Sequence, residues 1–298
     1  MTLSDLLNQA TATLHRAGIP TPRLEAELII SHVAGVRRVT LFSHPKMELP
    51  PDIEASVEQA VRRRAERVPL PYITGYREFM GLRFMVTPQT LIPRPETEVL
   101  VETALAFLQD QKRDGAMAER RWVLDIGAGS GAVAVSLAHF LPEIRVVATD
   151  ISWEALQVAK ENATRLAVAP RVRFVCANLL SPFRATLPSP RGGFLVIVAN
   201  LPYIPSEELP YLQPEVRDHE PRVALDGGSD GLTHYRQMIP EAARLLSAEG
   251  MLAVEVGLGQ SEVVGGMFRE AGLQQIEVIR DLAGIGRVVT GRGRGRER

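Results

Sequence analysis

From residue 122 onwards, short apolar segments alternate with segments that have a helical pattern. Seven of the apolar segments have the length of a buried strand, and they are residues 122–126, 145–149, 172–176, 194–199, 250–256, 275–279 and 287–290. A chain that alternates in this way forms a mainly parallel sheet with helices on both faces. No helical pattern separates the last two segments, so we expect them to pair as an antiparallel hairpin. The sequence therefore predicts an α/β fold with a Rossmann-like sheet that ends in an antiparallel hairpin.

The N-terminal region has helical patterns in place of strands. We expect one helix to begin with Ser4 as its cap, a second to run from Pro22 to Gly35, and a third to run from about residue 51 to residue 68. The run Arg62-Arg63-Arg64, together with Arg67, fits a solvated helix face better than a surface that binds RNA or an acidic partner. These patterns predict a small all-helical domain. No residue pattern in it indicates a catalytic site.

Composition divides the chain into four parts. Prolines and glycines interrupt residues 69–81, and the aromatic and β-branched residues between them predict a short hairpin. The C-terminal Arg/Gly segment cannot bury apolar surface, so we expect it to be disordered. The expected parts are a helical domain at residues 1–71, a hairpin linker at residues 72–90, an α/β domain at residues 91–291 and a disordered tail at residues 292–298.

Charge and cysteine content exclude several classes of protein. The 34 Lys and Arg residues nearly balance the 35 Asp and Glu residues, so no global field attracts nucleic acid or an anionic membrane. The single cysteine, Cys176, excludes a disulfide framework, and its apolar neighbours predict a buried, inert thiol. His139, His219 and His234 lack metal-ligand spacing, so we expect no metal. With no secretory signal and no apolar run long enough to span a bilayer, we expect a soluble, cytoplasmic protein.

A glycine-rich loop follows the first strand of the predicted sheet. Gly127, Gly129 and Ala132 match a dinucleotide fingerprint, and Asp150 stands where a carboxylate would bond ribose hydroxyls. Asp125, two residues before the loop, would repel a pyrophosphate and would suit a ligand with an ammonium or sulfonium end. The series from Asp125 resembles the first motif of S-adenosylmethionine-dependent methyltransferases, and the terminal hairpin resembles their sheet. An NAD-linked oxidoreductase stays as a second possibility.

A second polar loop, Asn200-Leu201-Pro202-Tyr203, follows the strand expected at residues 194–199. Ligands of open α/β sheets bind beyond the carboxyl ends of the strands, so this loop faces the glycine loop. The loop suits an acceptor nitrogen of an amide or exocyclic amine, because the Asn200 oxygen and a carbonyl of Leu201 or Pro202 can accept both N–H groups. These contacts would stabilise the charge that develops on the nitrogen during methyl transfer. Pro202 stiffens the loop, and Tyr203 offers a flat face for packing.

These motifs resemble those of the bacterial release-factor glutamine methyltransferases, the PrmC or HemK family. The likeness covers almost the whole chain, in the segments 91–98, 125–131, 200–204, 220–221, 225–232, 235–236 and 255–257 and at Asp150. It implies a class I methyltransferase that uses S-adenosylmethionine to methylate the side-chain amide nitrogen of Gln in the Gly-Gly-Gln motif of class 1 peptide-chain release factors. It also implies that the helical domain recognises the release factor. We expect a monomer that does not bind nucleic acid directly.

The resemblance also assigns residues to two sites. The residues implied for the cofactor are Leu91, Arg94, Gly127, Ala128, Gly129, Ser130, Gly131, Asp150, Ile151, Asn178, Leu179 and Asn200. Among them, Asp150 would bind the ribose hydroxyls, Asn178 would face the adenine edge, and Arg94 would help to close the site. The residues implied for the glutamine are Asn200, Leu201, Pro202 and Tyr203, of which Asn200, Pro202 and Tyr203 would act in catalysis.

Two residues depart from the family pattern. Leu201 stands where the family has Pro, and Asn178 stands where an acidic residue is commoner. Asn-Leu-Pro-Tyr is similar to the motif of rRNA adenine dimethylases, so an adenine methyltransferase acting on rRNA or DNA is the main alternative. The modest acidic pI argues against it, because phosphate contacts dominate nucleic-acid binding. A non-catalytic translation factor that only binds S-adenosylmethionine would leave the Asn200 loop unexplained.

Overall fold

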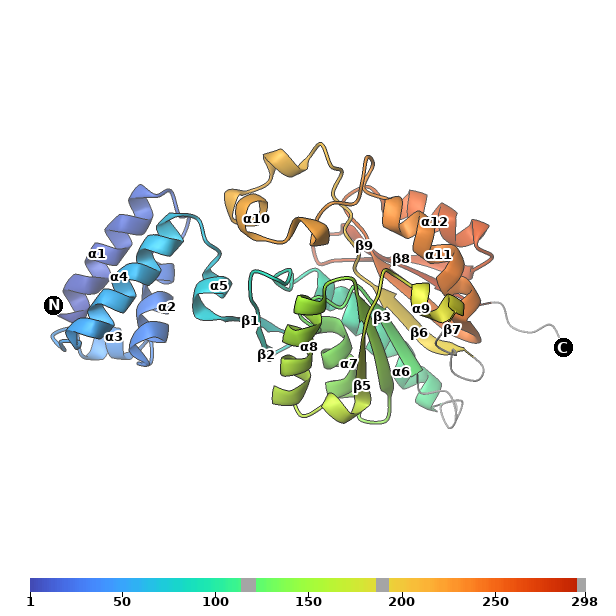
Figure 1. Cartoon of the computed structure of the whole chain (residues 1–298), viewed down its shortest axis with the longest axis horizontal. Helices are drawn as coiled ribbons and strands as arrows, with labels where there is room; N and C mark the ends of the chain where they lie inside the picture. The colour runs from blue at the N-terminus through green and yellow to red at the C-terminus, as the bar shows by residue number, and fades with distance from the viewer. Residues whose placement is uncertain (114–121, 186–192, 294–298) are drawn as a thin grey trace. The chain divides into compact units, whose positions relative to one another are not determined.

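The computed structural model describes residues 1–113, 122–185 and 193–293 (Figure 1). These residues form two compact units. The smaller unit contains Met1–Tyr76 and Leu212–His219, and the larger unit contains Arg77–Tyr211 and the chain from Glu220 onwards. The chain therefore leaves the larger unit after Tyr211 and returns to it at Glu220. No helix among the described residues is long and apolar enough to cross a membrane.

The smaller unit is all helical, as predicted. Its helices are α1 (Leu3–Arg16), α2 (Pro22–Ala34), α3 (Thr40–Ser43), α4 (Pro51–Ala65), α5 (Leu70–Thr74) and α10 (Pro214–His219). The second helix begins at Pro22 and ends at Gly35 as expected, because Gly35 takes the left-handed conformation with a φ of 66°. The prediction of Ser4 as a cap is wrong, since Thr2 accepts the Asp5 N–H at 3.2 Å and begins the helix earlier.

A buried arginine ties three helical segments of this unit together. Arg64 on α4 is only 4% exposed, and its guanidinium pairs with Glu25 on α2 and with Glu215 on α10. Arg67 pairs with the other oxygen of Glu215 at 3.0 Å. The prediction of a solvated basic face is thus wrong for Arg64, because helical periodicity turns that position inward while Arg62 stays exposed.

The larger unit has the predicted α/β fold. Its strands are β1 (Tyr76–Phe79), β2 (Leu82–Met85), β3 (Trp122–Ile126), β4 (Arg145–Asp150), β5 (Val172–Cys176), β6 (Phe194–Ala199), β7 (Leu246–Glu255), β8 (Gln274–Arg280) and β9 (Gly286–Arg292). Its helices are α6 (Thr97–Arg113), α7 (Ala132–Phe140), α8 (Trp153–Arg165), α9 (Ser181–Ala185), α11 (Thr233–Leu245) and α12 (Ser261–Glu270), and 3-10 turns lie at Ala169–Arg171, Leu209–Tyr211 and Arg222–Ala224.

The main sheet has the strand order β5-β4-β3-β6-β7-β9-β8 among the described residues (Figure 1). Strands β3 to β7 pair in parallel, and β9 pairs antiparallel with both β7 and β8. The expected terminal hairpin is therefore present. Strand β9 continues through Arg292, which pairs with Met251, so the segment expected to be disordered begins in a strand. Residues 294–298 of that segment lie outside the described residues.

Alternate strand residues supply two apolar cores, one on each face of the sheet. Val123 packs in the same cluster as side chains of α6, α7 and α8, whereas Leu124 and Ile126 pack with α11 and α12. All six residues of β6, at the centre of the sheet, are buried. Cys176 is exposed, and the prediction of a buried thiol is wrong, because it is the last residue of the edge strand β5.

Candidate active site

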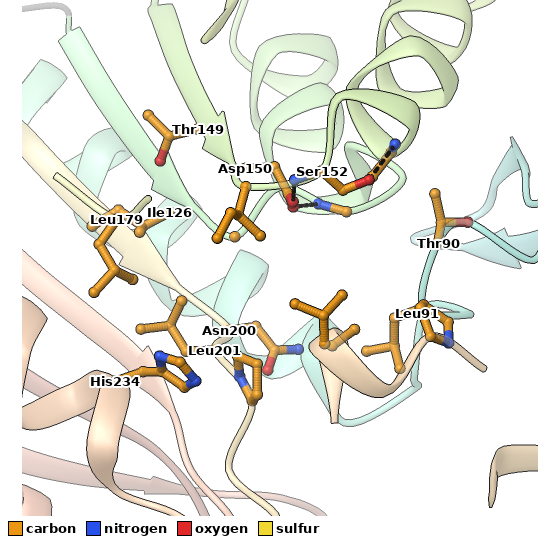
Figure 2. A pocket seen from close by; sticks show the side chains of 18 of the residues that line it. Thr90, Leu91, Ile126, Thr149, Asp150, Ser152, Leu179, Asn200, Leu201 and His234 are labelled. Atoms are coloured by element: carbon orange, nitrogen blue, oxygen red, sulfur yellow. Dashed lines mark hydrogen bonds between the residues drawn. The ribbon is translucent and has the colours of Figure 1, made fainter. Parts of the chain in front are cut away.

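A pocket opens at the carboxyl ends of β3, β4, β5 and β6 (Figure 2). Many of the sequence-predicted site residues line it, and they are Leu91, Gly127, Gly129, Asp150, Ile151, Asn178, Leu179, Asn200, Leu201 and Pro202. Pro221, in a segment that carries the family resemblance, also lines the pocket. Sequence reasoning missed other residues of the wall, which are Gln89, Thr90, Ile126, Thr149, Ser152, Ala155, Ala177, Val223, Ala224 and His234. The parallel strands therefore bring the two predicted loops to one pocket.

The glycine loop runs directly against the acceptor loop. Gly127 has a φ of 81°, and a Cβ atom there would lie 3.1 Å from Leu201 Cδ2 and 3.3 Å from the Asn200 carbonyl oxygen. Both the left-handed backbone and this close approach require glycine. Ala128, Ser130 and Gly131 of the same loop do not line the pocket, since Ser130 is buried and Gly131 is the N-cap of helix α7.

Asp150, at the end of β4, holds the glycine loop from the side. Its Oδ2 accepts the Gly129 N–H at 2.8 Å, and its Oδ1 accepts the Ser152 N–H at 2.9 Å (Figure 2). Burial raises the pKa of the Asp150 carboxyl, while these backbone hydrogen bonds lower it. The side chain is thus a fixed acceptor in the pocket wall.

Asp125 does not face the pocket, contrary to the sequence-based expectation. The side chain is 1% exposed, and its Oδ2 accepts the Ala134 N–H in the first turn of α7 at 3.0 Å. Burial raises the pKa of this carboxyl to about 7. The alternation along β3 explains the error, because Asp125 shares the face of Val123, which α7 covers. The carboxylate therefore holds a helix end and does not meet a cationic ligand.

The side chain of Asn200 lines the pocket (Figure 2). Its Nδ2 donates to Thr97 Oγ1 at 3.0 Å. Thr97 is the first residue of α6 and is buried. The contact turns the Asn200 oxygen away from Thr97, which leaves a hydrogen-bond acceptor for a ligand.

The remainder of the acceptor loop is held from within the fold. The buried Tyr235 hydroxyl lies 3.2 Å from the Leu201 carbonyl oxygen and 2.7 Å from the Glu255 carbonyl oxygen. A carbonyl has two lone pairs, so Leu201 keeps a free acceptor position. Tyr203 does not line the pocket, and its hydroxyl lies 3.5 Å from Glu255 Oε1. Burial raises the pKa of Tyr203 to about 12.

Arg94 is also set back from the pocket. It pairs with the buried Glu220, whose other carboxylate oxygen accepts the Ile92 N–H at 3.2 Å. Glu220 thus fixes the loop that carries Leu91, which does line the pocket. Arg94 thus orders this wall without lining the pocket, whereas Leu91 lines it.

These features together define a class I methyltransferase, because a glycine loop, a carboxylate after the second strand and an Asn-x-Pro-Tyr loop meet at one edge of a Rossmann-like sheet. Residues 123–219 match a family model described as a methyltransferase domain. Residues 5–75 match the model of the PrmC N-terminal domain.

The chain belongs to the release factor glutamine methyltransferase family, and the resemblance seen in its sequence is confirmed. It is 44% identical over 285 residues to the release factor glutamine methyltransferase of Moorella thermoacetica, with 95% of this chain and 96% of the relative covered. It is 43% identical to that of Geobacter sulfurreducens, with 98% and 96% covered. It is 40% identical to the release factor glutamine methyltransferase of Deinococcus radiodurans, with 99% of this chain and 100% of the relative covered.

Solved structures resemble the chain to different extents. A protein-(glutamine-N5) methyltransferase (release factor-specific) from Alicyclobacillus acidocaldarius is 30% identical, with 71% of this chain and 99% of that chain covered at a TM-score of 0.40. The hMettl16 catalytic domain, solved in complex with MAT2A 3'UTR hairpin 6, has a TM-score of 0.53 at 13% identity and 81% coverage of both chains. The second likeness is one of fold alone.

Proposed function

We propose that this protein methylates the side-chain amide nitrogen of the Gln in the Gly-Gly-Gln motif of class 1 peptide-chain release factors. Relatives of nearly full length carry the name release factor glutamine methyltransferase, which supports this substrate. The observation that carries the proposal is the amide of Asn200. Its nitrogen donates a hydrogen bond to Thr97 Oγ1, so its oxygen is available to accept an N–H group of the substrate beside the glycine loop.

The pocket residues fit S-adenosylmethionine as the methyl donor. The carboxylate of Asp150 lies in the wall, where it would accept hydrogen bonds from ribose hydroxyls. Asn178 follows β5 in the same wall and would accept from the adenine amine, while the apolar Leu179 and Ile151 would pack on the base. When bound, this cofactor supplies a methyl group on a positively charged sulfur.

The acceptor loop would compensate for the weak nucleophilicity of the substrate amide nitrogen. The lone pair of an amide nitrogen is delocalised into its carbonyl, so the nitrogen attacks poorly. The Asn200 oxygen and the Leu201 carbonyl would accept its two N–H groups and stabilise the positive charge that develops there. An asparagine amide is not a strong base, so the surplus proton leaves the nitrogen late in methyl transfer or after it.

The smaller, helical unit is the part of the protein that we expect to bind the release factor. Its described residues include no pocket residue of the active site, and its matched family model is the PrmC N-terminal domain. Val39 and Phe42 are more than half exposed there and offer apolar surface for a protein partner. We infer that this unit binds the release factor away from the Gln, and that the protein acts as a cytoplasmic monomer.

Mass spectrometry of the release factor tests the proposal directly. An unmodified release factor is incubated with this protein and S-adenosylmethionine, and the Gly-Gly-Gln peptide is then analysed. One added methyl on the Gln side chain is the expected result, and Asn200→Ala should abolish most of it. Methyl transfer to rRNA or DNA, with none to the release factor, would establish the adenine methyltransferase instead.

A further inference from the structure

One side chain ties the acceptor loop, residues 200–203, to the loop that follows β7. Gln260 lies 57 positions after Tyr203, and its Nε2 donates a hydrogen bond to the Tyr203 carbonyl oxygen at 2.9 Å. Strands β6 and β7 pair in parallel, with Ala199 opposite Val254, so the loops that follow them leave the sheet at the same edge. The topology of the sheet therefore brings Gln260 to the end of the acceptor loop.

The amide of Gln260 is held at its other end as well. Its Oε1 accepts the Gly257 N–H at 2.9 Å. The backbone N–H of Gln260 donates to the Gly257 carbonyl oxygen at 3.2 Å, and its carbonyl oxygen accepts the Val264 N–H at 3.0 Å where α12 begins. A backbone N–H can only donate, so Gly257 holds the oxygen of the amide and the nitrogen is left to face Tyr203.

Two glycines leave the space that this hydrogen bond needs. Gly231 has a φ of 76°, and a Cβ atom there would lie 2.2 Å from the Tyr203 carbonyl oxygen and 2.6 Å from Gln260 Nε2. A Cβ atom at Gly257 would lie 2.9 Å from Gln260 Oε1 and 3.1 Å from Tyr203 Cδ2. All four distances are shorter than van der Waals contact. The segments that carry Gly231 and Gly257 thus close around the contact between Gln260 and Tyr203.

We propose that Gln260 is a positioning residue for methyl transfer, which holds the acceptor loop in the conformation that receives the substrate amide. This inference rests on the proposed role of the Leu201 carbonyl. Peptide groups are planar, and the ring of Pro202 fixes its φ. Only ψ of Pro202 and the φ and ψ of Tyr203 therefore separate the Leu201 carbonyl from the Tyr203 carbonyl that Gln260 holds.

The Tyr235 hydroxyl does not by itself fix the Leu201 carbonyl. A hydroxyl has one proton to donate, and a carbonyl oxygen can only accept. The Glu255 carbonyl oxygen lies 2.7 Å from this hydroxyl and the Leu201 carbonyl oxygen 3.2 Å, so Glu255 is the closer acceptor. The direction of the Leu201 carbonyl therefore depends on the remainder of the loop. Tyr203, which does not line the pocket, serves as the anchor of that loop.

Gln260→Glu tests the role in methyl transfer. The introduced carboxylate has the same size and can still accept the Gly257 N–H, but it cannot donate to the Tyr203 carbonyl and repels it. We expect kcat for methylation of the release factor to fall roughly 10- to 100-fold, because a displaced contact misaligns the substrate amide. The Kd of S-adenosylhomocysteine should not change in calorimetry, since Asp150 and Gly129 keep their own hydrogen bond.

The matched control is Gln274→Glu. Gln274 is exposed at the start of β8, which is the end of that strand farther from the pocket. This variant makes the same chemical change at a position without a role in the acceptor loop, so its kcat should equal that of the wild type. A split between an impaired kcat and an unaltered cofactor Kd, seen in Gln260→Glu alone, separates positioning from a general loss of structure.

Hydrogen exchange measures the hold on the loop without any substrate. The N–H groups of Ile204 and Ser206 donate to the carbonyl oxygens of Leu225 and Gly228 at 3.1 and 2.9 Å, directly after the acceptor loop. In Gln260→Glu these amides should exchange roughly tenfold faster, because the loop opens more readily when one of its hydrogen bonds is lost. Exchange within β4 should match the wild type in both variants.

Gly257→Ala provides a second route if Gln260→Glu does not fold. Its new methyl group would meet the far end of the flexible Gln260 side chain, so the variant should fold with that amide displaced. It should show the same loss of kcat and the same faster exchange. Adding Gln260→Glu to Gly257→Ala should lower kcat by no more than about threefold further, because both changes break one contact.

Three results would overturn the inference. They are a kcat of wild-type size in Gln260→Glu or Gly257→Ala, unchanged exchange at Ile204 and Ser206, and a loss of cofactor affinity as large as the loss of kcat. A wild type that methylates no release factor would instead overturn the proposed function, and the exchange comparison would still decide whether Gln260 holds the loop.

Discussion

Replacing Glu255 by Gln should stabilise the larger unit, and the gain should grow as the pH rises. Burial is the main reason that the pKa of Glu255 is raised from 4.5 to about 7. Between these values the folded chain holds a proton that the unfolded chain has lost, so the free energy of unfolding falls with increasing pH. Below pH 4.5 the carboxyl is neutral in both the folded and the unfolded chain. Above pH 7 it is ionised in both, and the full cost of burying the charge lowers the free energy of unfolding.

The size of this destabilisation follows from the change in the pKa of Glu255 on folding. At about 1.4 kcal/mol per pKa unit, ionised Glu255 destabilises the fold by roughly 3 kcal/mol well above pH 7. Roughly 2 kcal/mol of this difference arises between pH 5.5 and pH 8.5. The neutral amide of the Gln variant does not titrate, so the variant should gain about that amount over the wild type across this interval. Asp125, whose pKa is also raised to about 7, titrates equally in both proteins and cancels.

Urea unfolding followed by tryptophan fluorescence measures this gain. The chain has two tryptophans, Trp122 and Trp153, and both belong to the larger unit, so the signal reports the unit that contains Glu255. The free energies of unfolding of wild type and variant are compared at both pH values, with Glu270→Gln as the exposed control. A difference between wild type and Glu255→Gln that stays constant with pH would refute the reasoning.

Three further changes probe the remainder of the site. Asn200→Ala should lower kcat by roughly 10²–10³ in single-turnover methylation while calorimetry shows an unchanged cofactor Kd; near-normal turnover would remove Asn200 from catalysis. Asp150→Ala should raise the S-adenosylmethionine Kd about 10- to 100-fold through loss of charge-assisted hydrogen bonds, and an unaltered Kd would exclude this role. Arg94→Ala should destabilise the larger unit by roughly 1–3 kcal/mol, because it leaves the buried Glu220 carboxylate without its ion-pair partner. Thermal denaturation should show recovery when Glu220→Gln is added, and a lack of recovery would contradict the pairing.

The sheet was largely predictable because buried parallel strands are continuous apolar runs. The limits of β3, β5 and β6 agree with the predicted residues 122–126, 172–176 and 194–199. Strand β7 begins at Leu246, four residues before the predicted start at Gly250. Its first part runs through the polar Ser247 and Glu249 and includes a register shift against β6, so hydrophobicity gave no signal there.

The site was predictable where function depends on a strand end and not where it depends on long-range contacts. Asn200 and Asp150 follow apolar runs directly, and the topology of parallel sheets places both at one edge. Thr97 contacts Asn200 across 103 positions of sequence, and no local pattern announces that contact. Glu255 did carry a signal, because it is a charged residue at the end of an apolar strand, as Asn200 is a polar one.

The sign of the stability change distinguishes a carboxylate that stabilises the fold from one that destabilises it. Replacement of a stabilising carboxylate lowers the free energy of unfolding, whereas replacement of the buried Glu255 should raise it above pH 7. Proteins keep destabilising groups where activity requires them, because selection acts on function once the fold is stable enough. Glu255 is buried, its Oε2 has no hydrogen-bond partner among the described residues, and it ends the strand beside the one that Asn200 follows. Methylation by Glu255→Gln should therefore be measured together with its stability.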